Sequence, residues 1–316
     1  YQMEHDSFRF PRSPNFSYKT AKPNSETSPR VIRDRSLIRY MRRDVLELAS
    51  HFASLVVILR SLYKQRKQKH RAMSVKTIAV LVAMEAEAAP LVERLGLQKQ
   101  EKSPFAGPLP AVVFTGLVGD TTVHVCINGP ALGFGVDSVG TVPAALTAYQ
   151  ACHVLRPDLL INAGTAGGFA AKGGSVGDVY LATRFCNHDR RIQIPGFDTY
   201  GIGAVDAARC PNLTDALGFK TGVVSTGNSL DCPSVDHENL QKNDASVKEM
   251  EAAGVAHVAR MFGIPLIAVK AITDIVDGDK TTHDEFMENL AAAAKALQDA
   301  VPKVIAFVAG KKIEDL

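Results

Sequence analysis

An α/β fold is the architecture that this 316-residue sequence predicts: a three-layer arrangement with a mainly parallel or mixed twisted sheet flanked by helices. From residue 77 onward, short apolar runs of strand length alternate with helical patterns, which is the order typical of α/β proteins. Several of these runs are β-branched and apolar throughout, as expected of strands that are buried on both faces. No internal repeat is visible, so the alternation predicts one domain and not an array.

Seven segments carry the strand pattern. They begin at Thr77 (TIAVLVA), Ala111 (AVVFT), Thr122 (TVHVCI), Leu159 (LLIN), Val176 (VGDVYLAT), Thr221 (TGVVST) and Pro265 (PLIAVKAI).

Four helices are predicted between or after these strands. They cover residues 86–95, 137–155, 250–262 and 282–309. Gly96 and Gly263 provide C-terminal stop signals, and the second helix ends before Pro157. The last helix is expected to begin with a capping box at Thr282 to Glu285.

The first 72 residues differ from the rest in composition. They hold 16 lysines and arginines against 6 acids, whereas residues 73–316 hold 20 against 27. The pI of about 8.5 therefore comes from the N-terminal segment, and the acidic remainder argues against a nucleic-acid partner. We interpret residues 1–72 as a disordered or non-native extension, either a translated upstream stretch or a transit peptide. A short helix over residues 45–63 is too interrupted to span a membrane.

The five cysteines are Cys126, Cys152, Cys186, Cys210 and Cys232. They are odd in number, scattered, and form no C-x-x-C pair, which predicts a reduced protein without a structural metal. His188, His237 and His257 have no metal-ligand spacing either. We therefore expect no metal, no cofactor and a cytoplasmic location.

Carboxylates stand at the ends of three predicted strands: Glu85 and Glu87 after the first, Asp231 after the strand from Thr221, and Asp274 at the end of the last. A glycine-rich segment at residues 162–168 follows the fourth strand. Ligands of open α/β sheets bind at the carboxyl ends of strands. Each feature also has a structural explanation: first-turn acids suit a helix dipole, and glycines allow a tight turn. The glycine spacing matches neither a dinucleotide loop nor a P-loop.

The order of these motifs resembles the plant-type 5′-methylthioadenosine nucleosidases of the purine nucleoside phosphorylase superfamily. The similar segments cover nearly all of residues 77–316. They are AMEAEAAPL from Ala83, ALGFGVDSVGTVPAAL from Ala131, LLINAGTAGGF from Leu159, VGDVYLAT from Val176, HDRRIQIPGFDTYGIG from His188, STGNSLD from Ser225, KEMEAAGVAHVA from Lys248 and KAITDIVDGDK from Lys270.

The resemblance implies a nucleoside phosphorylase-like fold and hydrolysis of the N-glycosidic bond of methylthioadenosine in methionine salvage, with S-adenosylhomocysteine as a further candidate substrate. By resemblance, Glu87 activates the attacking water and Asp274 protonates the departing purine. A carboxylic acid that keeps its proton near neutral pH needs a pKa raised by burial. We expect such a shift for Asp274.

The resemblance also implies the residues that hold the nucleoside. Glu251 would bind the ribose hydroxyls with Met250 and Met84 against the sugar, Thr165, Ala166 and Gly167 would form the floor, and Leu230 and Asp231 would border the purine, with Lys270 also at the site. Two positions depart from the family pattern. Asn228 replaces an Asp of plant relatives, and Lys270 replaces an Arg of bacterial ones, although lysine lacks the fork of arginine.

Two other functions compete with hydrolysis. A phosphate-dependent phosphorylase would need a basic phosphate cradle, but Asn162 stands where an Arg is expected and Glu85 and Glu87 would repel phosphate. A non-catalytic, storage-type relative would lack Glu87 or Asp274, and both are present. The family further implies a homodimer, for which residues 188–203 are a candidate contact, an ordinary surface loop being the alternative.

Overall fold

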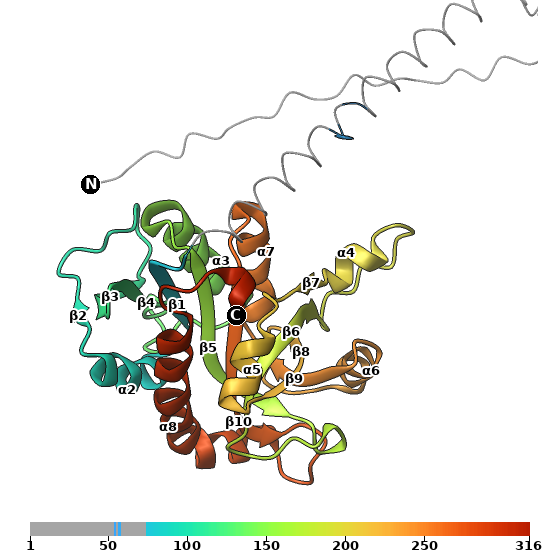
Figure 1. Cartoon of the computed structure of the whole chain (residues 1–316). Coiled ribbons are helices and arrows are strands. Elements are labelled where there is room, and N and C mark those ends of the chain that lie inside the picture. Colours follow the sequence, from blue (N-terminus) through green and yellow to red (C-terminus); the bar gives the residue numbers. More distant parts are fainter. Residues whose placement is uncertain (1–53, 55, 58–73) are drawn as a thin grey trace, which may run out of the picture. The chain divides into compact units, whose positions relative to one another are not determined.

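The computed structural model describes residues 54, 56, 57 and 74–316, and the fold is formed by residues 74–316 (Figure 1). The helix predicted over residues 45–63 lies almost entirely outside the described residues. Within the described part, no helix combines the length and the apolar character that a membrane span requires.

The predicted α/β architecture is confirmed: one mixed sheet of ten strands is flanked by helices. The strands are β1 (Thr77–Val82), β2 (Gln98–Lys99), β3 (Val112–Val118), β4 (Thr121–Ile127), β5 (Leu159–Gly168), β6 (Val179–Asn187), β7 (Val205–Asp206), β8 (Lys220–Thr226), β9 (Ala245–Glu249) and β10 (Leu266–Ile275).

One half of this sheet closes on itself. The strand order is β10-β6-β8-β9-β5-β1-β4-β3-β2, and β10 pairs with β5 as well as with β6. Strands β5, β10, β6, β8 and β9 therefore form a ring, which includes antiparallel steps between β10 and β6 and between β5 and β9. Strand β5 pairs with β10 over most of its length, with β1 over its first residues and with β9 at its end. All ten of its residues are buried.

Helices cover both faces of the sheet (Figure 1). The long α8 (Thr282–Val308) and α2 (Glu85–Leu95) contribute to one apolar cluster, whereas α3 (Thr141–Gln150) and α7 (Ala252–Phe262) contribute to the other. Val80, Ile161 and Val269 belong to the first cluster, and the residue before each of them belongs to the second. This two-sided burial explains why the strands lack a polar alternation. The shorter helices are α4 (Asp198–Ile202), α5 (Pro211–Leu217) and α6 (Ser234–Lys242).

Three details differ from the predictions. The glycine-rich segment 162–168 forms the last seven residues of strand β5 and is not a turn. The second helix begins at Thr141, four residues later than predicted, and ends in a π turn at Ala151–Leu155. Helix α8 is capped by the side chain of Thr281, which accepts a hydrogen bond from the Asp284 N–H, so the capping box predicted at Thr282 is wrong by one position.

The sequence pattern does not predict strand β9. Its sequence, ASVKE, places lysine and glutamate in consecutive positions, a composition that suggests an exposed segment. In the structure both side chains are buried, because β9 lies between β8 and β5 within the ring.

Candidate active site

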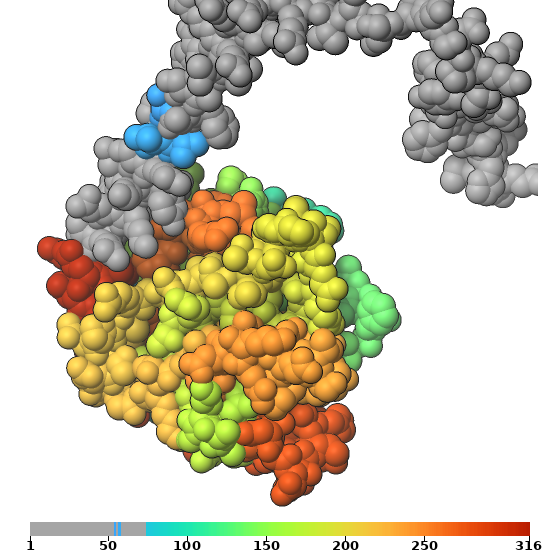
Figure 2. All heavy atoms as spheres, turned by 90° about the vertical axis from the view of Figure 1, so that its right-hand side faces the viewer, coloured from blue at the N-terminus to red at the C-terminus, as the bar shows by residue number. Residues whose placement is uncertain are grey.

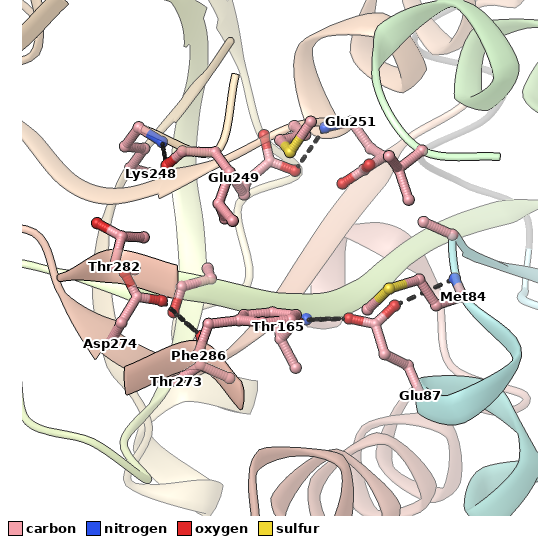
Figure 3. A pocket seen from close by; sticks show the side chains of 16 residues that line it. Met84, Glu87, Thr165, Lys248, Glu249, Glu251, Thr273, Asp274, Thr282 and Phe286 are labelled. Atoms are coloured by element: carbon pink, nitrogen blue, oxygen red, sulfur yellow. Dashed lines mark hydrogen bonds between the residues drawn. The ribbon is translucent and has the colours of Figure 1, made fainter. Parts of the chain in front are cut away.

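A cavity of about 260 Å³ opens where the ends of several ring strands meet the N-termini of α2, α7 and α8. Most predicted site residues line it: Met84, Glu87, Thr165, Ala166, Gly167, Leu230, Met250, Glu251 and Asp274. They share the lining with residues that were not predicted: Ala83, Val139, Lys248, Glu249, Thr273, Thr282 and Phe286 (Figure 3).

Glu87 lies at one end of this cavity. It lies in the first turn of α2 and is buried. Its Oε1 accepts hydrogen bonds from the Thr165 backbone N–H at 2.6 Å and from the Thr165 hydroxyl at 2.7 Å. Among the described residues, the one donor to its Oε2 is the Met84 N–H, at 3.3 Å. Burial raises the pKa of Glu87, although the two Thr165 hydrogen bonds and the Lys270 charge oppose this effect. A raised pKa makes the carboxylate a better base.

A buried ion pair lies behind Glu87. Lys270 of β10 donates to Glu249 Oε2 at 2.8 Å, and both side chains are 1% exposed. Glu249 also accepts hydrogen bonds from the Thr226 hydroxyl and from the N–H groups of Glu251 and Ala252. Burial alone would raise the pKa of Glu249, but the Lys270 charge and these hydrogen bonds together hold it below its ordinary value. Glu249 is therefore ionised, and both of its carboxylate oxygens are bonded to donors within the protein.

Glu251 is a different kind of carboxylate. Its Oε1 accepts the N–H of Gly140 at 2.8 Å, just before helix α3. Within the described part of the chain, its Oε2 has no hydrogen-bond donor, and the residue lines the cavity. Burial and the neighbouring charge of Glu249 raise the pKa of Glu251 to about 7, against the attraction of Lys270. One oxygen is therefore available to a ligand that brings hydroxyl donors.

Asp274 lies toward the other side of the cavity, with Thr165 between it and Glu87 in the view of Figure 3. Its Oδ1 accepts a hydrogen bond from the Thr273 hydroxyl at 2.7 Å. Its Oδ2 occupies the space of the missing Gly167 side chain, because a Cβ there would lie 2.7 Å from this oxygen. Burial raises the pKa of Asp274, as expected from the sequence, while the Lys248 charge opposes the shift. The arrangement suits a carboxyl group that donates a proton.

The Ser229–Leu230 wall follows strand β8, and its residue Leu230 lines the cavity. Lys248 Nζ donates to the backbone carbonyls of Ser229 at 3.0 Å and Leu230 at 2.8 Å. The preceding residue, Asn228, accepts hydrogen bonds from the Thr141 N–H and hydroxyl, and its own N–H and amide donate to Asp189 Oδ2. The loop after β8 is thereby tied to α3 and to the segment after β6.

Two predicted site residues do not line the cavity. Lys270 is buried behind the surface and bonded to Glu249, so the structure places it one layer from any ligand. Asp231 is exposed and does not belong to the lining, although its neighbour Leu230 does. Conversely, Lys248 and Glu249 are not predicted because they lie on the unpredicted β9. The one available sequence signal is the charged pair directly before Met250 and Glu251. Within the described residues, no three His, Cys, Asp or Glu side chains converge to hold a metal ion.

Comparisons with known proteins agree with this architecture. The family model described as the phosphorylase superfamily matches residues 77–306. A 5′-methylthioadenosine/S-adenosylhomocysteine nucleosidase of Arabidopsis thaliana is 45% identical over 242 residues, covering 77% of this chain and 95% of the relative.

Solved structures give the same picture. The apo form of an Arabidopsis thaliana 5′-methylthioadenosine nucleosidase is 44% identical, covers 77% of this chain and 100% of that one, and has a TM-score of 0.76. A Helicobacter pylori 5′-methylthioadenosine/S-adenosyl homocysteine nucleosidase is 23% identical and covers 74% of this chain and 99% of that one, with a TM-score of 0.61. This likeness shows the shared fold alone.

Proposed function

This chain belongs to the phosphorylase superfamily, among the plant-type 5′-methylthioadenosine nucleosidases, and from that premise we propose that it hydrolyses 5′-methylthioadenosine to adenine and 5-methylthioribose. The observation that carries the proposal is the presence of two buried carboxyl groups, Glu87 and Asp274, in one cavity. They come from separate elements, and burial raises the pKa of both. Two such groups can serve as base and acid in one reaction.

Cleavage of the N-glycosidic bond passes through an oxocarbenium-like sugar, so the site must stabilise a cation, activate water and accept a departing purine. Glu87 takes a proton from the water that attacks the anomeric carbon. Glu251 binds the ribose hydroxyls through its available oxygen and places negative charge near the developing cation, with Met84 and Met250 against the sugar. Asp274 gives its proton to the purine as the carbon–nitrogen bond breaks.

The charges in the cavity favour water over phosphate as the nucleophile. Three glutamates, Glu87, Glu249 and Glu251, line the cavity. Among its described lining residues the sole cation is Lys248, which is bonded to backbone carbonyls next to the purine wall. Asn162, at the position where phosphorylases are expected to have Arg, is buried and donates to the Leu81 carbonyl. A phosphate dianion would meet repulsion without a cationic partner.

The test is adenine release from methylthioadenosine in phosphate-free buffer, repeated with added phosphate and with S-adenosylhomocysteine as a second substrate. We expect phosphate-independent release that falls about 10²–10⁴-fold in Glu87→Gln, the range for losing a general base. Release that depends on phosphate would make the protein a phosphorylase. A folded protein with no release in either buffer would support the non-catalytic alternative.

We also propose that the protein acts as a homodimer. Apolar side chains are exposed along one surface that leads from the loop before α3 into the helix: Leu132, Phe134, Val136, Val142, Leu146 and Tyr149. Figure 2 shows the mint-green segment near residue 130 projecting from the molecule. Val139 in the same stretch lines the cavity, so a second copy on this surface would border the site. Contiguous exposed apolar residues of this kind typically mark an interface.

Sedimentation of the purified chain tests the dimer directly. We expect twice the monomer mass at micromolar concentration, and a monomer for Phe134→Lys combined with Leu146→Lys. A wild-type monomer at these concentrations would contradict the proposal.

A further inference from the structure

Lys248 is a buried cation that the hydrolytic mechanism does not use. The residue is 5% exposed, and no carboxylate of the described residues lies within ion-pair distance of its Nζ. Burying an ammonium group without a paired charge is costly. Two of its three N–H donors are bonded to the Ser229 and Leu230 carbonyls. Such a residue calls for an explanation beyond packing.

The sheet register places Lys248 beside Asp274. In the antiparallel pairing of β5 and β9, Lys248 lies directly opposite Gly167. Residues opposite each other project to the same face, with Cβ atoms about 4.5–5.5 Å apart. Asp274 Oδ2 lies 2.7 Å from where the Gly167 Cβ would be. The glycine thus leaves room for the carboxyl group on the face to which the Lys248 side chain projects, and both residues line the cavity.

We propose that Lys248 is a positioning residue for the departure of the purine: it holds the Ser229–Leu230 wall in place and stabilises the Asp274 carboxylate that forms on proton donation. This inference rests on the proposed hydrolysis. As the carbon–nitrogen bond breaks, its electron pair goes to the purine, the Asp274 proton moves to a purine nitrogen, and Glu87 takes a proton from the attacking water. Lys248 keeps its protons throughout and acts only through its charge and its two hydrogen bonds.

Charges around the pair set the direction of the effect. Burial raises the pKa of Asp274, and the charge of Glu285 at the start of α8 raises it further. The Thr273 hydrogen bond and the Lys248 charge both lower this pKa. Burial in turn lowers the pKa of Lys248, against the attraction of several acidic groups, among them Asp274, Asp231 and Asp236. Removing the lysine charge should therefore raise the pKa of Asp274 further and make it a weaker acid.

The role of Lys248 is tested by measuring kcat for methylthioadenosine against pH in the wild type, in Lys248→Met and in Lys248→Arg. The alkaline limb reports the group that must stay protonated, Asp274. In Lys248→Met we expect this limb to move up by about one pH unit or more, the scale for a neighbouring charge, with kcat below the limb reduced about tenfold. Lys248→Arg keeps the charge, so its limb should stay near that of the wild type even if KM rises.

Lys242→Met is the matched control, because Lys242 lies on the surface of α6 in a solvent-exposed pair with Glu238. It should change neither kcat nor the limb. If Lys248→Met raises KM for methylthioadenosine but leaves the alkaline limb where it is, the lysine is only a loop anchor and the proposal is overturned. An inactive wild type would instead refute the proposed hydrolysis, so the two failures are distinguishable. Circular dichroism at each pH confirms that every variant is folded.

Discussion

The two halves of the cavity handle charge in opposite ways. In the sugar half, Glu87, Glu249 and Glu251 lie around the buried cation Lys270, which is bonded to Glu249. In the purine half, Asp274 has a buried cation as a neighbour, but that lysine is bonded to backbone carbonyls and not to the acid. The sugar half thus contains a permanent ion pair, whereas in the purine half the acid is not bonded to the ammonium group and becomes charged only when its proton leaves.

This difference matches the demands of the reaction. The sugar half meets a developing cation, so an excess of carboxylates is useful there, and Lys270 limits the repulsion between them. The purine half must first hold a neutral acid and then a carboxylate. A nearby but unbonded ammonium serves the second state without forcing the first to ionise. The comparison predicts different consequences when a charge is removed from each half.

Removal of the cation from the sugar half should cause the largest loss of stability. Lys270→Met leaves three buried or half-buried carboxylates without their common partner. Breaking a buried pair in this way costs roughly 3–5 kcal/mol. Urea unfolding at pH 7.5 measures the loss, and Lys270→Met/Glu249→Gln should recover part of it. If Lys270→Met is as stable as the wild type, the ion pair does not organise this half.

Glu251 should make the stability of the sugar half depend on pH. Its pKa of about 7 in the folded protein exceeds the ordinary value of 4.5, so between these two values the folded state holds the extra proton. The free energy of unfolding should therefore decrease as pH rises from about 4.5 through 7. Chemical unfolding at pH 5, 6 and 7.5 should show a shallower decrease in Glu251→Gln. An identical slope in that variant would assign the dependence to other groups.

The smallest expected effect concerns the loop that carries the purine wall. Asn228→Asp keeps an oxygen for the Thr141 donors but places a second carboxylate against Asp189. We expect a loss of about 1 kcal/mol in stability, the scale of one hydrogen bond, with a higher KM. Asn228→Asp/Asp189→Asn exchanges the two groups and should restore both. Failure of this exchange would show that the bond between the two side chains does not position the loop.

Much of this site was predictable from sequence because its residues occur in ordered motifs. Glu87, Glu251 and Asp274 follow recognisable strands or begin helices, and the structure brings them into one cavity. Lys248 and Glu249 were not predictable in the same way. Charged residues in consecutive positions suggest solvent exposure, and only closure of the strand ring through β10 and β5 buries them.

The position of Lys270 shows a second limit. Its motif suggests a ligand-binding residue, but the order of motifs along the chain does not show how deeply a side chain is buried. The side chain lies under the cavity because Lys270 is opposite Gly164 in the parallel pairing of β10 and β5. Its Nζ lies 3.6 Å from the position of a Gly164 Cβ. Whether a charged side chain reaches a ligand or only a neighbouring carboxylate depends on such packing, which no local pattern records.

The division of labour between the halves is tested most directly with a methylthioribosyl substrate whose leaving group, such as 4-nitrophenolate, needs no proton. We predict that Asp274→Asn loses about 10²–10⁴-fold on methylthioadenosine but cleaves the nitrophenyl substrate within a few-fold of the wild-type rate. Glu87→Gln should lose activity on both. Equal losses of Asp274→Asn on the two substrates would contradict the assignment of Asp274 as the acid that protonates the purine.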